Sequence, residues 1–149
     1  MSEILKLFSN YTLNVALMCW VSAQVCKTVF HYIRTKKLRL ERLAGSGGMP
    51  SAHSATVSSL ASAVVKTEGL RSANFAIAFM FAFIVMYDAS GVRRAAGEQA
   101  KILNHLINDL SERKPVYWKK NLKELIGHTP LEVIAGALIG ILIVLIVPY

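Results

Sequence analysis

The sequence predicts an all-α integral membrane protein, a bundle of about four transmembrane helices with an additional amphipathic helix at the membrane interface. Hydrophobic residues make up 54% of the 149 residues, and the mean hydropathy is +0.43. A soluble domain of this length usually carries more charge and less apolar mass. The apolar residues are also gathered into separate blocks. We expect one domain over residues 1–149.

A membrane helix needs about 17–25 mostly apolar residues. Three blocks meet this requirement, namely Tyr11–Ile33, Ser72–Asp88 and Leu131–Pro148. A shorter, Ser-rich block, Ser51–Val65, is marginal, and we expect it to span by packing against its neighbours. The first block is long and lacks a small-residue cleavage pattern, so no cleavable signal peptide is expected.

The segment Glu98–Leu110 has the pattern of an amphipathic helix. Its apolar positions recur at helical spacing: Ile102, Leu103, Leu106, Ile107 and Leu110. We expect this helix to lie on the inner leaflet of the membrane.

The basic residues indicate how the helices are oriented. Of the 17 Lys and Arg residues, five fall between Arg34 and Arg42 and eight between Arg93 and Lys123. Basic loops stay preferentially in the cytoplasm, which places these two loops inside and both chain termini outside. The charges flank membrane segments without a nucleic-acid recognition motif, so no nucleic-acid partner is expected.

Two histidine elements stand far apart in the chain. Pro50-Ser51-Ala52-His53-Ser54 and Gly127-His128-Thr129-Pro130-Leu131-Glu132 each open an apolar segment. Two histidines at neighbouring helix ends can together catalyse the cleavage of a phosphate ester, since one attacks phosphorus and the other protonates the leaving oxygen. Ser and His after a loop Pro also form a helix N-cap, and the two roles can coexist.

Residues around these elements suit the same chemistry. Glu132 follows His128 by four residues, so its carboxylate can accept from one ring nitrogen, fix the tautomer and leave the other nitrogen free to attack. The Gly-rich turn at 45–48 precedes a helix start, where free amides favour a phosphate dianion.

Four charged residues are candidates for holding the phosphate. Lys27 lies within the first apolar block, where it either binds a substrate phosphate or extends to the inner interface. Asp88 precedes the pair Arg93 and Arg94, which suggests a phosphate clamp with an acidic orienting partner. The alternative is a basic pair that sets topology, with Asp88 bridged to one arginine. The sequence does not separate the roles of Arg93 and Arg94.

These motifs, with Gly47-Gly48-Met49 and the stretch 88–94, resemble the divergent bacterial and plastid branch of the type 2 phosphatidic acid phosphatase superfamily, which also includes vanadium-dependent haloperoxidases. The resemblance implies a helical bundle, a phosphohistidine intermediate, and neither a catalytic metal nor a cofactor. It implies that His128 is the nucleophile, that His53 is the general acid, and that Glu132 stands where the main branch has Asp. Ser51 and the Ala52 amide match phosphate contacts.

The sequence departs from the main branch at two points. The main branch has a Ser-Arg pair shortly before its nucleophilic histidine, whereas Asn121–Gly127 contains no Arg. Its Lys followed by Arg-Pro is also absent from the loop before Pro50. We expect Arg93 or Arg94, together with Lys27, to supply the missing positive charge.

The expected function is that of a metal-independent lipid phosphatase in the bacterial cytoplasmic membrane, acting at the cytoplasmic face on phosphatidylglycerol phosphate or phosphatidate. A homo-oligomer is compatible with the sequence. One alternative is a non-catalytic membrane protein that binds an anionic lipid or a partner. Another is a metal-dependent membrane hydrolase with His53, Asp88, His128 and Glu132 as ligands.

Overall fold

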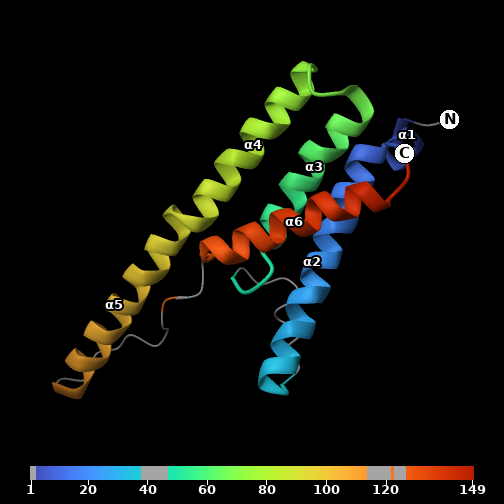
Figure 1. Cartoon of the computed structure of the whole chain (residues 1–149). Coiled ribbons are helices and arrows are strands. Elements are labelled where there is room, and N and C mark those ends of the chain that lie inside the picture. Colours follow the sequence, from blue (N-terminus) through green and yellow to red (C-terminus); the bar gives the residue numbers. More distant parts are fainter. Residues whose placement is uncertain (1–2, 38–46, 114–121, 123–126) are drawn as a thin grey trace.

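The computed structural model describes residues 3–37, 47–113, 122 and 127–149. These residues form helices joined by turns and loops, without a strand (Figure 1). The helices are α1 Glu3–Phe8, α2 Tyr11–Thr35, α3 Ala52–Glu68, α4 Ala73–Ser90, α5 Val92–Arg113 and α6 Pro130–Ile146. The expected all-helical bundle is confirmed.

Polar side chains fix where the long helices begin. Asn10 caps α2, Ser51 caps α3, Ser72 caps α4 and Thr129 caps α6, and each side-chain oxygen accepts from a backbone amide three residues later. Such caps satisfy amides that the first helical turn leaves without a partner. The helices therefore start close to the boundaries that the apolar blocks predict.

Helix α3 occupies the centre of the bundle, in contact with α2, α4 and α6. Two glycines of α6 allow a close approach to α3. A Cβ atom on Gly136 would lie 2.3 Å from the Ser51 carbonyl oxygen, and one on Gly140 would lie 2.3 Å from that of Ala55. Ser58 Oγ donates to the Ala137 carbonyl at 3.0 Å across the same contact. Small residues that bring two backbones together are typical of helices packed within a membrane.

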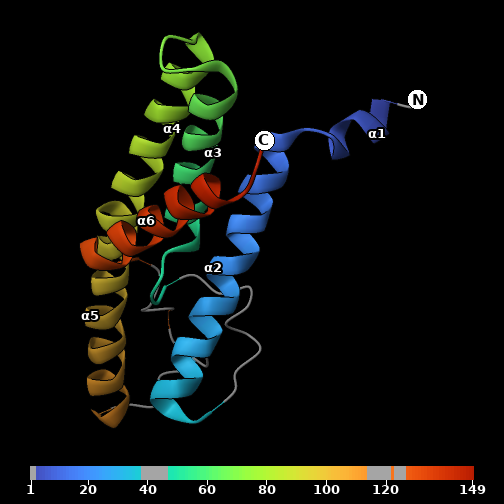
Figure 2. The ribbon, with the colours of Figure 1, turned by 45° about the vertical axis from the view of Figure 1, so that its right-hand side comes forward.

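The two chain termini lie at the same end of the bundle (Figures 1 and 2). Tyr11 Oη donates to the Val147 carbonyl at 3.0 Å, which ties the start of α2 to the end of α6. Lys66 Nζ donates to the carbonyls of Val144 and Val147 at 3.0 and 2.6 Å. A cation at these carbonyls stabilises the C-terminal end of α6.

The helices differ in how well each alone could cross a membrane. By length and composition, α2 and the run Ala73–Leu110 qualify, and α6 is a shorter apolar helix. Helix α3 is not among them, and four of its residues have no exposed surface, namely Ser54, Ala55, Ser59 and Ala63. This burial agrees with the expectation that the Ser-rich block depends on its neighbours.

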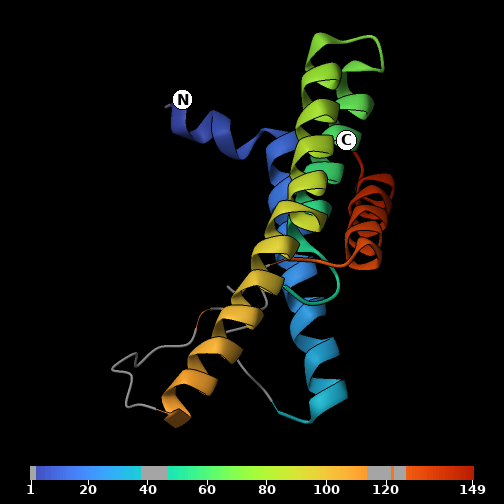
Figure 3. The same cartoon turned by 90° about the vertical axis from the view of Figure 1, so that its left-hand side faces the viewer.

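Helix α5 starts earlier than the amphipathic helix that the sequence predicts. It begins at Val92 rather than Glu98, and Gly91 alone separates it from α4. Figures 1 and 3 show α5 continuing beyond α4, away from the other helices. Arg93, Arg94, Ala95 and Ala96 are good helix formers, so the helix forms before its apolar face begins.

Candidate active site

The fold brings the two histidine elements together. His53 lies in the first turn of α3 and His128 lies two residues before α6, and their ring centroids are 6.4 Å apart. Two backbone bonds hold the arrangement. The His128 amide donates to the Ala89 carbonyl at 3.0 Å, and the Ser51 amide donates to the Glu132 carbonyl at 3.0 Å. The ends of α3, α4 and α6 are thereby joined around the histidines.

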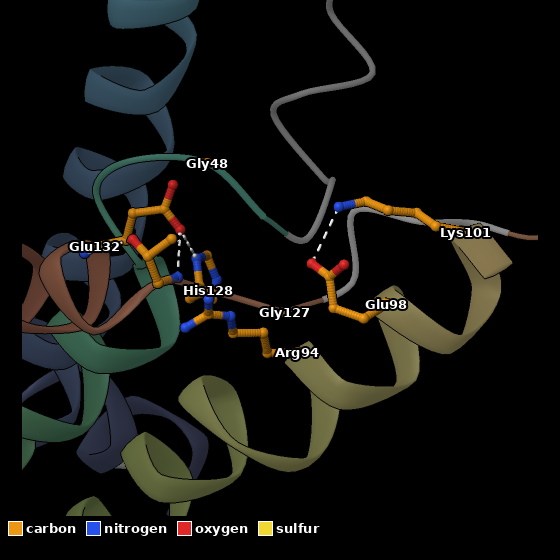
Figure 4. Close-up of a pocket in the computed structure, with 8 residues that line it drawn as sticks. Gly48, Arg94, Glu98, Lys101, Gly127, His128 and Glu132 are labelled. Carbon is orange, nitrogen blue, oxygen red and sulfur yellow. Dashed lines mark hydrogen bonds and ion pairs between the residues drawn. The ribbon is translucent and has the colours of Figure 1, made fainter.

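Glu132 holds one ring nitrogen of His128. His128 Nδ1 and Glu132 Oε2 lie 3.2 Å apart, and the same oxygen accepts from the Thr129 amide at 3.0 Å (Figure 4). The Glu132 amide donates to Thr129 Oγ1, which completes a capping box at the start of α6. The carboxylate is therefore fixed by the helix start, and it favours the tautomer with the proton on Nδ1.

The second ring nitrogen of His128 has a different environment. The residue is 2% exposed, and Nε2 has no hydrogen-bond partner among the described residues. Buried polar atoms usually have such partners, so an orphaned one points to a ligand or a reaction. In the Nδ1-protonated tautomer, Nε2 carries a free lone pair, which is the feature that a nucleophile requires.

Burial lowers the pKa of His128 from its ordinary value of 6.5. The hydrogen bond and the charge of Glu132 oppose this effect, while the positive charges of Lys27 and Arg93 add to it. The imidazole is consequently neutral at neutral pH, and its Nε2 lone pair stays available.

The two arginines after α4 occupy different positions. Arg93 Nε bonds to Asp88 Oδ2 at 2.5 Å, and both side chains are partly exposed. Arg94 lies beside His128 and Glu132 in a pocket (Figure 4). The structure thus separates a pair that the sequence left equivalent: Arg93 bridges to Asp88, and Arg94 faces the histidine.

The pocket has a volume of about 190 Å³. It is lined by Gly48, Arg94, Glu98, Lys101, Gly127, His128, Thr129 and Glu132. The ion pair of Lys101 Nζ with Glu98 Oε1, at 3.0 Å, lies across the pocket from His128 (Figure 4). The sequence analysis missed Glu98 and Lys101 as site residues. Their spacing from Arg94, four and seven residues along one helix, is the signal that would have found them.

Gly127 allows the loop before α6 to reach α5. A Cβ atom at this position would lie 2.3 Å from the Arg94 Cα atom and 2.7 Å from the Arg93 carbonyl carbon. Only glycine permits this approach of two backbones. The contact places His128, the next residue, against the turn that carries both arginines.

Lys27 faces a second hollow, of about 490 Å³, that lies beside the first. The two hollows share Gly48 and Glu132 as lining residues. Lys27 is 3% exposed, so its charge is kept near the histidines and away from the surrounding solvent. Gly48 and the preceding Gly47 have φ values of 86° and 82°, which suit glycine and shape the turn between the hollows.

Ser51 has a structural role in the first histidine element. Its Oγ accepts from the Ser54 amide and from Ser54 Oγ, at 3.3 and 3.0 Å. Ser51 is fully buried, and Ala52 is 1% exposed. The N-cap that the sequence allowed is therefore present. The phosphate contacts expected of Ser51 and the Ala52 amide stay predictions.

The residues proposed as metal ligands do not form a ligand cluster. Over the described ranges 3–37, 47–113, 122 and 127–149, no group of three or more His, Cys, Asp or Glu is placed to hold a metal ion. Asp88 is paired with Arg93, and Glu132 with His128. This geometry gives no support to the four-ligand alternative.

The sequence of the chain is similar to a described protein family and to a known membrane protein. Residues 8–143 match the family described as the divergent PAP2 family. The chain is 41% identical to a protein of Bacillus subtilis (strain 168) named uncharacterized membrane protein YuiD, over 97% of this chain and 98% of that protein. No solved structure matches the chain. With a family match over nearly its whole length and a membrane protein as relative, this membrane chain belongs to the divergent PAP2 family.

Proposed function

We propose that the chain is a metal-independent lipid phosphatase that hydrolyses a phosphomonoester of a membrane lipid at the cytoplasmic face. The observation that supports this most strongly is the state of His128. One ring nitrogen is held by a carboxylate, and the other is buried without a partner among the described residues. Family membership supports the general class of chemistry.

In the first step, His128 Nε2 attacks phosphorus and the bond from phosphorus to the lipid oxygen breaks. A phosphohistidine forms, and the leaving oxygen takes a proton from His53, whose ring lies 6.4 Å from that of His128, centroid to centroid. The proton that stays on His128 Nδ1 is stabilised by Glu132 as the ring gains positive charge.

In the second step, water attacks the phosphohistidine. His53, now neutral, accepts a proton from the water, the bond from nitrogen to phosphorus breaks, and orthophosphate is released. His53 is thereby returned to its protonated form, and His128 to its neutral form. One histidine acts as acid and then as base, as microscopic reversibility requires.

Positive charge around the histidines would stabilise the phosphoryl oxygens in the transition state. Arg94 lines the same pocket as His128, and its planar guanidinium matches two phosphate oxygens. Lys27 approaches from the neighbouring hollow. In our proposal these two residues replace the arginines of the main branch, and Arg93 is held by Asp88 as a supporting charge.

A release assay with purified protein tests the proposal. Phosphatidate and phosphatidylglycerol phosphate in vesicles should release orthophosphate in the presence of EDTA, and vanadate should inhibit, because its trigonal-bipyramidal adduct with His128 mimics the transition state. His128→Ala should abolish turnover and any acid-labile phosphoenzyme. A requirement for added Mg²⁺, or wild-type turnover in His128→Ala, would refute the mechanism.

His53→Ala tests the role of the general acid. General-acid help is worth about 10²–10⁴-fold for a poor leaving group, and an activated aryl leaving group needs little of it. The variant should therefore lose far more activity on a lipid phosphate than on an aryl phosphate. Equal losses on both substrates would show that His53 acts in some other way.

A further inference from the structure

Another cavity, apart from the pocket at His128 and the hollow at Lys27, lies between α3, α4 and α6 and has a volume of about 290 Å³. Its walls are almost entirely apolar, and none of the described residues that line it is ionisable. Small side chains such as Ala61, Ala82 and Ala137 leave the space, while Phe75 and Met86 lie towards its two ends along α4. We call this cavity the apolar groove.

The packing of the helices explains the groove. Gly136 and Gly140 bring the backbone of α6 against that of α3, and the Ser58 hydroxyl bonds to the Ala137 carbonyl at the same contact. Helix α4 also packs on α3, but it has far less contact with α6. The side chains between α4 and α6 therefore do not fill the space over α3.

One end of the groove lies next to the candidate active site. On α4, Met86 stands two residues before Asp88, about 3 Å along the helix axis. On α3 and α6, the first groove residues are Ser58 and Ala137, each five residues after a site residue, about 7.5 Å along the axis. Three helices thus lead from the groove to the histidines.

The length of the groove matches one leaflet of a membrane. Along α4 its lining runs from Met86 to Phe75, which corresponds to about 16 Å of helix. The hydrocarbon core of a bilayer is about 30 Å thick, so the groove extends from the site over about half of that depth. A chain that starts at the site and follows the groove would end near the middle of the bilayer.

We propose that the apolar groove binds one hydrocarbon chain of the lipid whose phosphate lies at His128. This inference rests on the proposed function for the identity of the head group. It explains how an active site with polar walls can accept a membrane lipid, because the chain stays among apolar side chains while the phosphate enters the pocket. The hydrocarbon chain of the lipid and its phosphate then occupy separate cavities.

Filling the groove tests the proposal. Ala137→Leu adds bulk inside it, and Ala76→Leu makes the same change on the exposed surface of α4, outside it. Turnover of a long-chain phosphatidate relative to dihexanoyl phosphatidate should fall by about 10–200-fold in Ala137→Leu, the range for misfit in an apolar pocket, and stay unchanged in Ala76→Leu. An unchanged ratio in folded Ala137→Leu would overturn the proposal.

A photolabelling experiment on the wild-type protein gives a second test of the groove proposal, and it does not depend on catalytic turnover. Vesicles contain a phosphatidate with a photoactivatable group in mid-chain, or a phosphatidylcholine with the same chain. Phosphatidate should label residues between Phe75 and Met86 more strongly than phosphatidylcholine does. Equal labelling would mean that bulk lipid fills the groove, which contradicts the inference. Selective labelling without phosphate release would instead contradict the proposed function and leave the groove assignment standing.

Discussion

At the scale of single residues, Glu132 joins structure and chemistry more closely than any other site residue. Its carboxylate bonds to His128 and to the Thr129 amide, and its carbonyl accepts from the Ser51 amide. Removing the whole side chain would therefore disturb the start of α6 as well as the histidine. A test of its chemical role has to keep the hydrogen bonds and remove only the charge.

Glu132→Gln makes that change. The Gln side-chain oxygen can still accept from the Thr129 amide, so the thermal unfolding temperature should stay close to that of the wild type. Without the carboxylate the His128 imidazolium is no longer stabilised, and turnover should fall by about 10²–10⁴-fold, the upper end being the loss in a serine protease. Glu68→Gln, at the far end of α3, is the matched control and should keep full turnover. Wild-type turnover in Glu132→Gln would refute the orienting role.

The lowered pKa of His128 predicts a pH dependence. Only the neutral ring can attack, so kcat/KM should fall on the acidic side with a midpoint below 6.5. The folded protein binds this proton more weakly than the unfolded chain does. The contribution of His128 to stability is therefore full above about pH 6.5 and declines as the pH falls. Lys27→Met removes a charge that lowers the pKa and should raise the midpoint. A midpoint above 6.5 in the wild type would contradict the conclusion that burial lowers the pKa of His128.

Short spacing along the chain is what the sequence reports best at this scale. The pairing of His128 with Glu132 was predicted from their separation of four residues, although His128 lies just before α6 and the capping box, rather than a shared helical face, positions the carboxylate. The division of labour between Arg93 and Arg94 was not predicted, since it depends on where the Gly127 loop meets α5. Lys101 was not predicted as a site residue for a similar reason, because its position in the pocket follows from the early start of α5.

At the scale of elements, the contact between α3 and α6 sets the positions of both histidines. The substitution Gly136→Ala tests this contact, because the sign of the resulting change in stability depends on how tightly the two helices pack. In a helix free of contacts this substitution would stabilise by about 1 kcal/mol through helix propensity. Here the new Cβ atom would lie 2.3 Å from the Ser51 carbonyl oxygen. The expected net result is destabilisation, since overpacking costs about 1–3 kcal/mol and the backbone of α3 is the obstacle. Thermal unfolding in detergent measures it, and a raised unfolding temperature would show that the contact is loose.

The sequence predicted the elements well where hydrophobic blocks and caps coincide. Ser51 and Ser72 mark the starts of α3 and α4, and the apolar blocks give their approximate lengths. The start of α5 was misplaced because periodicity locates an apolar face, whereas helix formation at Val92 depends on propensity and on the turn at Gly91. The groove between α4 and α6 was not predictable, since it depends on how three helices pack.

At the scale of the whole molecule, the bundle has two unlike ends. The termini and the short turn between α3 and α4 lie at one end, and the starts of α3 and α6, near which the histidines lie, are placed with α5 towards the other (Figures 1 and 2). The described parts of the two basic segments, residues 34–37 and 93–113, belong to the second end. A site at this end, flanked by lysines and arginines, suits an anionic head group.

The difference between the two ends of the bundle yields a prediction about the orientation of the protein in the membrane, and this prediction does not depend on catalysis. By the positive-inside rule, the end with the site faces the cytoplasm, and the turn between α3 and α4 lies outside with both termini. In a background without Cys19 and Cys26, Thr67→Cys should react with an impermeant thiol reagent in intact cells, and Ser111→Cys should react only after permeabilisation. The opposite pattern would place the site on the outer surface. The lipid phosphate would then have to be one presented in the outer leaflet, and the phosphatidate and phosphatidylglycerol phosphate of the inner leaflet would be excluded as substrates.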